Sequence, residues 1–174
     1  LFTLTNSTVQ NSRGNAGGGL YITGGINRIE QSTITNNESV QFSGGGLIIR
    51  EDAHLTIDQS SIISNTATAR GGGVRVNNAS YLTITNSTLY GNHALISGGG
   101  LYANDGTIAI INSTLSQNRA DDDGGAIYGG TTIDLIYATI VSNTAVSGSG
   151  DGIYINGSPA VALTSTLLGN HADE

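Results

Sequence analysis

Residues 71–101 read GGGVRVNNASYLTITNSTLYGNHALISGGGL, and this stretch contains one complete unit of a repeat that runs through the 174-residue chain. Each unit opens with a glycine-rich triplet that is followed by an aliphatic residue. Six copies occur at intervals of 26 or 27 residues, with their aliphatic residues at Leu20, Leu47, Val74, Leu101, Ile127 and Ile153. A fixed period of this length is typical of a solenoid, in which each unit packs against the next one.

A second motif, Ser-Thr-aliphatic-x-x-Asn, follows the same period, and in the quoted unit it spans residues 87–92. Stacking of the units brings equivalent residues of neighbouring units side by side. Because asparagine side chains hydrogen-bond readily to nearby backbone amides, we expect them to form an internal amide ladder. Its members are Asn37, Asn65, Asn92, Asn118, Asn143 and Asn170.

Each unit also contains three short stretches of alternating apolar residues, and none is long enough for an amphipathic helix. In the quoted unit, Leu82 and Ile84 alternate with polar residues, and Leu89 lies in the stretch that follows. The pattern predicts an all-β fold, namely a single-stranded parallel β-helix of about six to seven coils of 25–28 residues, with three short strands per coil. Parallel pairing at a spacing of about 4.8 Å then aligns the inward residues into continuous apolar columns.

Residues 1–174 are expected to form one β-helix domain. The chain starts without methionine and inside a recognisable repeat, so we expect it to be a segment of a longer protein. A terminal coil leaves backbone groups unpaired, and solenoids need caps to prevent end-to-end association. Further β-helix coils or a partner chain are therefore expected at the two open ends.

The composition excludes several classes of partner and site. The chain contains six basic residues, all arginine, and 13 acidic residues, and the resulting net charge of -7 opposes binding to nucleic acid. No apolar run approaches the length of a membrane span, so direct membrane insertion of this segment is not expected. The absence of cysteine excludes disulfides and thiolate metal sites.

The repeats resemble those of right-handed parallel β-helices of the pectate-lyase-like superfamily, and among them the polymorphic outer-membrane-protein repeats of bacterial surface adhesins. Residues 124–127, Gly-Gly-Ala-Ile, match one motif of that family, and the aliphatic-x-x-Asn copies match its Phe-x-x-Asn motif with the aromatic residue replaced. The resemblance covers nearly the whole chain. It implies a right-handed helix, an extracellular or cell-surface location on a bacterium, and a non-enzymatic, adhesin-like scaffold.

One outward column carries four of the seven tyrosines of the chain. By alternation, the residue after each glycine-motif aliphatic points outward, and this column reads Tyr21, Ile48, Arg75, Tyr102, Tyr128 and Tyr154. Aromatic rings bind sugars, but stacked rings also stabilise neighbouring strands by about 0.5 to 1.5 kcal/mol a pair. Both interpretations stay open, and the first predicts a face for glycan or protein contact formed by Tyr21, Tyr102, Tyr128 and Tyr154.

The alternative function is that of a polysaccharide lyase or glycoside hydrolase of the same superfamily, which needs converging carboxylates. Glu51 and Asp105 are the catalytic candidates, because they occupy equivalent positions two coils apart. The strand spacing places them at a separation on the order of 10 Å, which overlaps that of the two carboxylates of an inverting glycosidase. Asn78 lies between them and is neither acid nor base. The acidic cluster Asp121, Asp122 and Asp123 is the candidate for calcium, yet it lies in a single turn. We therefore expect no catalytic residue and no cofactor.

Overall fold

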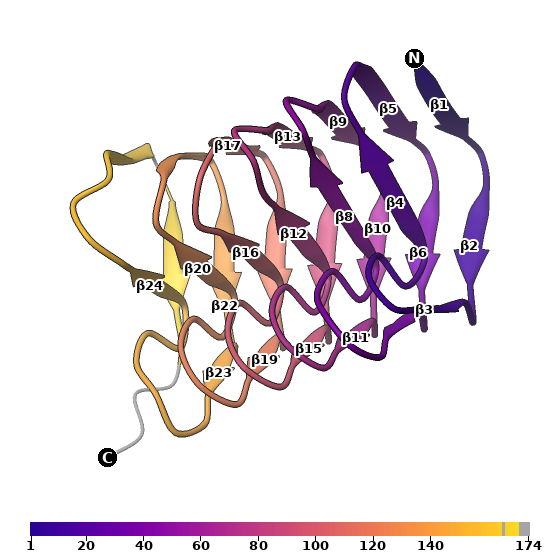
Figure 1. The fold of residues 1–174 in the computed structure, drawn as a ribbon. Helices are drawn as coiled ribbons and strands as arrows, with labels where there is room; N and C mark the ends of the chain where they lie inside the picture. The colour runs from indigo at the N-terminus through magenta and orange to yellow at the C-terminus, as the bar shows by residue number, and fades with distance from the viewer. Residues whose placement is uncertain (165, 171–174) are drawn as a thin grey trace.

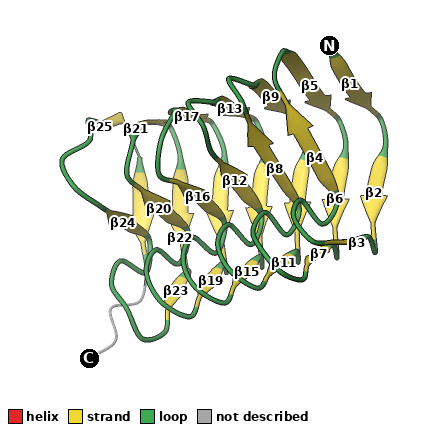
Figure 2. Ribbon diagram, in the orientation of Figure 1, coloured by secondary structure: helices red, strands yellow, loops and turns green. Residues whose placement is uncertain are grey.

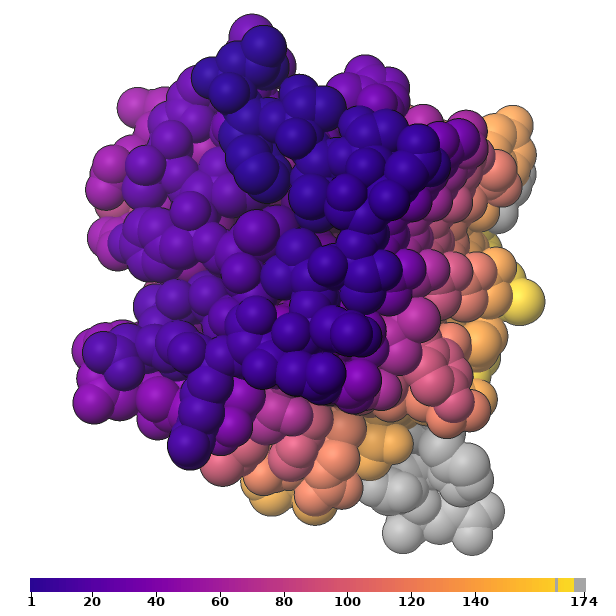
Figure 3. Space-filling view, turned by 90° about the vertical axis from the view of Figure 1, so that its right-hand side faces the viewer, coloured from indigo at the N-terminus to yellow at the C-terminus, as the bar shows by residue number. Residues whose placement is uncertain are grey.

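The computed structural model describes residues 1–164 and 166–170. These residues form a parallel β-solenoid in which each strand pairs with its copies in the neighbouring coils (Figures 1 and 2). The end-on view in Figure 3 shows the first coil in front and the later coils in regular rows behind it. The all-β solenoid predicted from the repeat is confirmed.

Two of the four sheets contain seven strands each. Sheet 1 contains β1 (Phe2–Thr5), β5 (Ile26–Glu30), β9 (His54–Asp58), β13 (Tyr81–Thr85), β17 (Thr107–Ile111), β21 (Thr132–Ile136) and β25 (Val161–Thr164). Sheet 2 contains β2 (Thr8–Gln10), β6 (Thr33–Thr35), β10 (Ser61–Ile63), β14 (Thr88–Tyr90), β18 (Thr114–Ser116), β22 (Thr139–Val141) and β26 (Leu167–Gly169).

The other two sheets contain six strands each. Sheet 3 contains β3 (Arg13–Gly14), β7 (Glu38–Ser39), β11 (Thr66–Ala67), β15 (His93–Ala94), β19 (Arg119–Ala120) and β23 (Thr144–Ala145). Sheet 4 contains β4 (Leu20–Thr23), β8 (Leu47–Arg50), β12 (Val74–Val76), β16 (Leu101–Ala103), β20 (Ile127–Gly129) and β24 (Ile153–Ile155). A coil thus has four strands instead of the predicted three, because the strands of sheet 3 are only two residues long and show no alternation to detect.

The register aligns the apolar side chains into buried columns, as expected. Leu82 pairs with Leu55 on one side and Ile108 on the other, and all three are buried. Asn27 interrupts this column in an early coil and is only 4% exposed. Its Nδ2 donates to the carbonyl of Gly24 at 2.9 Å, and its Oδ1 accepts the N–H of Phe2 at 3.2 Å. The buried amide therefore has partners on both of its polar atoms.

The asparagine ladder is confirmed, and Asn92 illustrates its geometry. Its Oδ1 accepts both the backbone N–H and the Nδ2 of Asn65, each at 3.0 Å. Its Nδ2 donates to the Oδ1 of Asn118 at 3.0 Å and to the carbonyl of Ile62 at 2.9 Å. The side-chain bonds between neighbouring rungs continue from Asn37 to Asn170. The ladder therefore gives hydrogen-bond partners to the buried side-chain amides at each corner between sheets 2 and 3.

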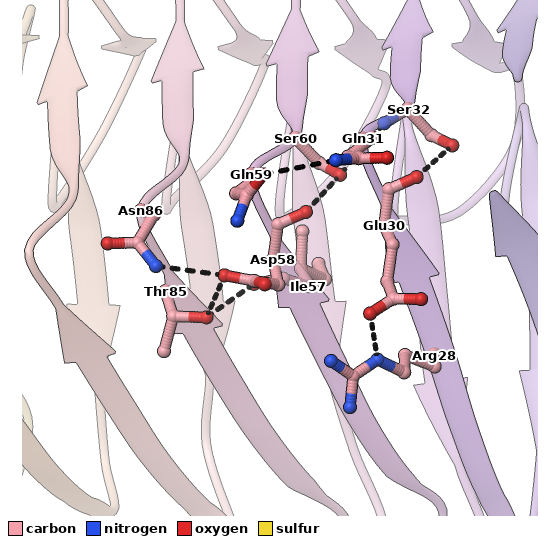
Figure 4. A network of polar contacts seen from close by, with 10 residues as sticks. All are labelled: Arg28, Glu30, Gln31, Ser32, Ile57, Asp58, Gln59, Ser60, Thr85 and Asn86. Atoms are coloured by element: carbon pink, nitrogen blue, oxygen red, sulfur yellow. Dashed lines mark hydrogen bonds and ion pairs between the residues drawn. The ribbon is translucent and has the colours of Figure 1, made fainter. Parts of the chain in front are cut away.

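A second ladder, formed by the serine of the same motif, was not predicted. The Oγ of Ser87 donates to the carbonyl of Thr85 at 2.6 Å and accepts the N–H of Ser60 at 3.0 Å. Figure 4 shows the equivalent bonds from Ser32 and Ser60 to the carbonyls two residues before them. The serines are buried and take part in turning the chain from sheet 1 into sheet 2.

The second glycine of each triplet lies against the backbone of the next coil. A Cβ on Gly72 would lie 2.5 Å from the carbonyl oxygen of His93 and 2.5 Å from that of Gly99. Both contacts are with backbone, which cannot move without disturbing the strand pairing. Glycine is therefore needed here for a close approach of two coils.

Asp151 stands at the matching triplet position of a later coil. In the adjacent strand β23, the N–H of Thr144 donates to the preceding coil, and so does the N–H of Val146, the residue that follows the strand. The N–H of Ala145 points the other way, because successive N–H groups alternate along a strand. The Oδ1 of Asp151 accepts this N–H at 2.6 Å. A carboxylate therefore engages the outward N–H of the outermost strand of sheet 3 among the described residues.

Candidate functional site

The register of sheet 4 confirms that the predicted tyrosines lie in one column. Tyr102, Tyr128 and Tyr154 pair on consecutive strands, with ring centroids 4.6 Å and 5.1 Å apart. Tyr21 lies at the other end of the column, separated from them by Ile48 and Arg75. The column therefore consists of a stack of three rings and one isolated ring.

The stacked rings are mostly covered, whereas Tyr21 is open to solvent. Tyr102 is only 7% exposed, and the guanidiniums of Arg75 and Arg70 lie 5.3 Å and 5.5 Å from its ring centroid. Burial raises the pKa of Tyr128. Tyr21 is 48% exposed. This geometry favours stacking as the role of Tyr102 and leaves Tyr21 accessible to a ligand.

Three arginines gather on this face, and they are half of the basic residues of the chain. They are Arg50, Arg70 and Arg75. Burial lowers the pKa of Arg75, and repulsion from Arg70 and Arg50 lowers it further. Within residues 1–164 and 166–170, the arginines that form ion pairs are Arg13, Arg28 and Arg119. Among the described residues, the three arginines of this face form no ion pair, although the charge of Asp105 opposes the lowering of the pKa of Arg75.

Arg50 and Arg75 are held by neutral groups. Arg50 Nη1 donates to the hydroxyl of Tyr21 at 2.7 Å, and Arg75 Nη1 donates to the Oγ of Ser43. The Nε atoms of both arginines are buried and have no hydrogen-bond partner in the part of the chain that the structure describes. The two guanidiniums are thus positioned while several of their N–H donors remain unused.

These side chains line a cavity of about 510 Å³. Ile48 and Ala16 contribute apolar surface, Tyr21 and Phe42 contribute aromatic rings, and Arg50 and Arg75 contribute charge; Asn15, Ser43 and Asn77 complete the lining. Phe42 is 58% exposed and lies in the loop between β7 and β8. A concave site that combines apolar and aromatic surface with a few convergent polar groups is typical of ligand-binding sites.

The sequence prediction placed Tyr21, Ile48 and Arg75 in one outward column but assigned only Tyr21 to the binding face, and it missed the other side chains of this cavity. Arg75 stands in the tyrosine column itself, and Arg50 lies two residues after Ile48, so alternation places both on the same outward face. Strand alternation could therefore have identified both arginines from the sequence. Phe42 could not be found, because no strand pattern fixes the direction of a loop residue.

The catalytic candidates are not brought together by a described contact. Glu51 is exposed in the turn after β8. The Oδ2 of Asp105 accepts the N–H of Asn78, the residue that lies between them, at 3.1 Å. The Oδ1 of Asp105 is buried and has no partner among the described residues. Asp105 therefore joins neighbouring coils through the turn.

The acidic cluster of Asp121, Asp122 and Asp123 does not act as one group, because each carboxylate has its own surroundings. Asp121 contacts His93 Nε2 and Arg119 Nη2, both at 3.0 Å. Burial alone raises the pKa of Asp121, but His93 and Arg119 outweigh it and hold the pKa below its usual value. Asp123 accepts the N–H of Ser149 at 2.8 Å, and Asp122 is exposed. In the described ranges, no three histidine or acidic side chains form a group suited to a metal ion.

A different carboxylate, that of Asp58, offers a test by pH. Thr85 Oγ1 and Asn86 Nδ2 donate to its Oδ1 at 2.7 Å and 3.0 Å (Figure 4), and these bonds lower its pKa below 3.8. A lowered folded-state pKa stabilises the fold above the unfolded value, and this contribution is lost as the pH falls through the folded-state value. We therefore expect Asp58→Asn to destabilise the protein at pH 7 and to match wild type in strong acid. Urea unfolding across the pH range measures this difference, with the exposed Asp122→Asn as control. A constant difference at every pH would contradict it.

No helix that is long and apolar enough to span a membrane occurs within the described ranges.

The fold and this face define a parallel β-solenoid with an aromatic and arginine-lined cavity. A family model described as "Right handed beta helix region" matches residues 2–137. The chain therefore belongs to the right-handed β-helix family, and the predicted hand of the helix is confirmed. No curated protein and no solved structure matches the chain.

Proposed function

We propose that this chain is a non-enzymatic, adhesin-like scaffold, extracellular or on the surface of a bacterium, that contacts a glycan or a protein. The observation that carries the proposal is the cavity beside Tyr21, where exposed rings adjoin arginines that form no ion pair with any described residue. Acidic side chains elsewhere contact local groups separately, which supports binding over a lyase or hydrolase reaction. The regular coils hold the face rigid, and rigidity lowers the entropic cost of binding.

Replacing Tyr21 should separate binding from stability. We expect Tyr21→Ala to abolish most ligand retention while changing the free energy of unfolding by less than about 1 kcal/mol, since the ring is largely exposed. Tyr102→Ala should instead lower stability, because that ring is buried between Arg75 and Tyr128. Retention on glycan and protein arrays, combined with urea unfolding, measures both effects.

The matched control is Tyr137→Ala, which removes an exposed ring outside sheet 4. It should leave retention unchanged. If Tyr21→Ala retains every ligand that the wild-type protein retains, the proposed binding face is wrong.

A further inference from the structure

We propose that the cavity beside Tyr21 binds an acidic peptide segment, whose aspartate or glutamate carboxylate pairs with Arg50 and Arg75. An apolar side chain next to this carboxylate packs against Phe42 and Ile48. The inference rests on the proposed function, because it names the partner class for the same face.

The charge of the cavity selects an anion. Arg50 and Arg75 each make one side-chain hydrogen bond to a neutral neighbour in the described structure, although a guanidinium carries five N–H donors. Asp105 acts on Arg75 without forming an ion pair with it, so neither guanidinium has a direct counter-ion among the described residues, and a bound carboxylate offsets the cost of burying them. The chain as a whole does not attract an anion, since its net charge is -7. Positive charge at this place is therefore local and complementary to an acidic partner.

The shape of the donors favours a carboxylate. A guanidinium presents paired N–H groups in one plane, and a carboxylate accepts them through two oxygens. Two arginines in one cavity can hold both oxygens from different sides. We therefore assign the anion as a carboxylate.

The remaining lining favours a peptide over a sugar. Ile48 is 4% exposed and adds apolar surface to the cavity, and the ring of Phe42 stands open beside it. A sugar would need partners for many hydroxyls, yet the oxygen of Ser43 already accepts bonds from Arg75 and from the N–H of Arg70. A peptide side chain needs only the apolar surface. Tyrosine and arginine are also the residues that dominate binding energy at protein interfaces.

The test compares two peptides that differ in one group. The probes are acetyl-Gly-Leu-Glu-Phe-Gly-amide and the same peptide with glutamine in place of glutamate, titrated into the full chain and followed by NMR. The acidic peptide should bind roughly tenfold more tightly than the neutral one, since a charge-assisted bond is lost. Added salt should weaken only the acidic peptide.

Arg75→Gln and, separately, Arg50→Gln should each remove this preference. The second variant keeps the test decisive if the partly buried Arg75 proves necessary for folding, which circular dichroism monitors. Arg28→Gln is the matched control, because it makes the same charge change on sheet 1, where Arg28 pairs with Glu30. It should leave both affinities unchanged.

Three results would overturn the inference. The first is equal binding of the two peptides by the wild-type protein. The second is a loss of the preference for the acidic peptide in the Arg28→Gln control that equals the loss in the other two variants. The third is tighter binding of glucuronate than of the acidic peptide. In each case the proposed function survives if Tyr21→Ala still abolishes retention of other ligands. That function fails only when Tyr21→Ala changes no retention.

Discussion

Asn92→Leu should lower the free energy of unfolding by about 4 kcal/mol, because it breaks the ladder at its centre. Leucine has a similar size but cannot accept the backbone N–H and Nδ2 of Asn65, or donate to Ile62 and Asn118. Asn92 is fully buried, so water cannot replace these bonds. Each buried polar group left without a partner costs about 1 to 3 kcal/mol.

Urea unfolding followed by circular dichroism measures this loss. The control is Asn104→Leu, which changes an exposed asparagine after β16 and should shift stability by less than about 0.5 kcal/mol. Equal losses in the two variants would mean that the ladder contributes nothing specific.

Gly72→Ala should lower the free energy of unfolding by about 3 kcal/mol, although it adds a single methyl group. The added carbon would lie 2.5 Å from backbone atoms of His93, in the next coil. The two coils must separate, and this weakens the pairing of β11 with β15 and of β12 with β16. Because neighbouring coils depend on one another in a solenoid, the strain acts on both sides of the substitution.

The control is Gly14→Ala, where the new Cβ would lie at least 3.4 Å from its neighbours. Its stability should stay close to that of wild type in the same unfolding experiment. A mild effect at Gly72 would show that the coils can move apart at little cost.

The sequence was sufficient to predict the solenoid, because one period fixes both the stacking and the register. Leu82 aligns with Leu55 and Ile108 simply because they are one repeat apart. The short strands of sheet 3 were missed, since two residues cannot show alternation. The serine ladder was missed for another reason: Ser87 is small and polar, and nothing in its spacing distinguishes a buried serine from a turn residue.

The candidate site was only partly predictable. Alternation placed Tyr21 and Arg75 in one column, and the structure confirms that placement. Alternation in the sequence does not reveal that Tyr102 is covered while Tyr21 is open, because the exposure of each ring depends on where Arg70 and Arg75 lie. Phe42 comes from a loop, whose direction follows from contacts between coils.

The carboxylate of Asp151 occupies a backbone donor of β23, the outermost strand of sheet 3 among the described residues. A coil added beyond it in the same geometry would meet a side chain where Gly72 meets only backbone, and would find the N–H of Ala145 already engaged. A strand that joins β23 must therefore displace the Asp151 carboxylate before it can pair with the backbone of sheet 3.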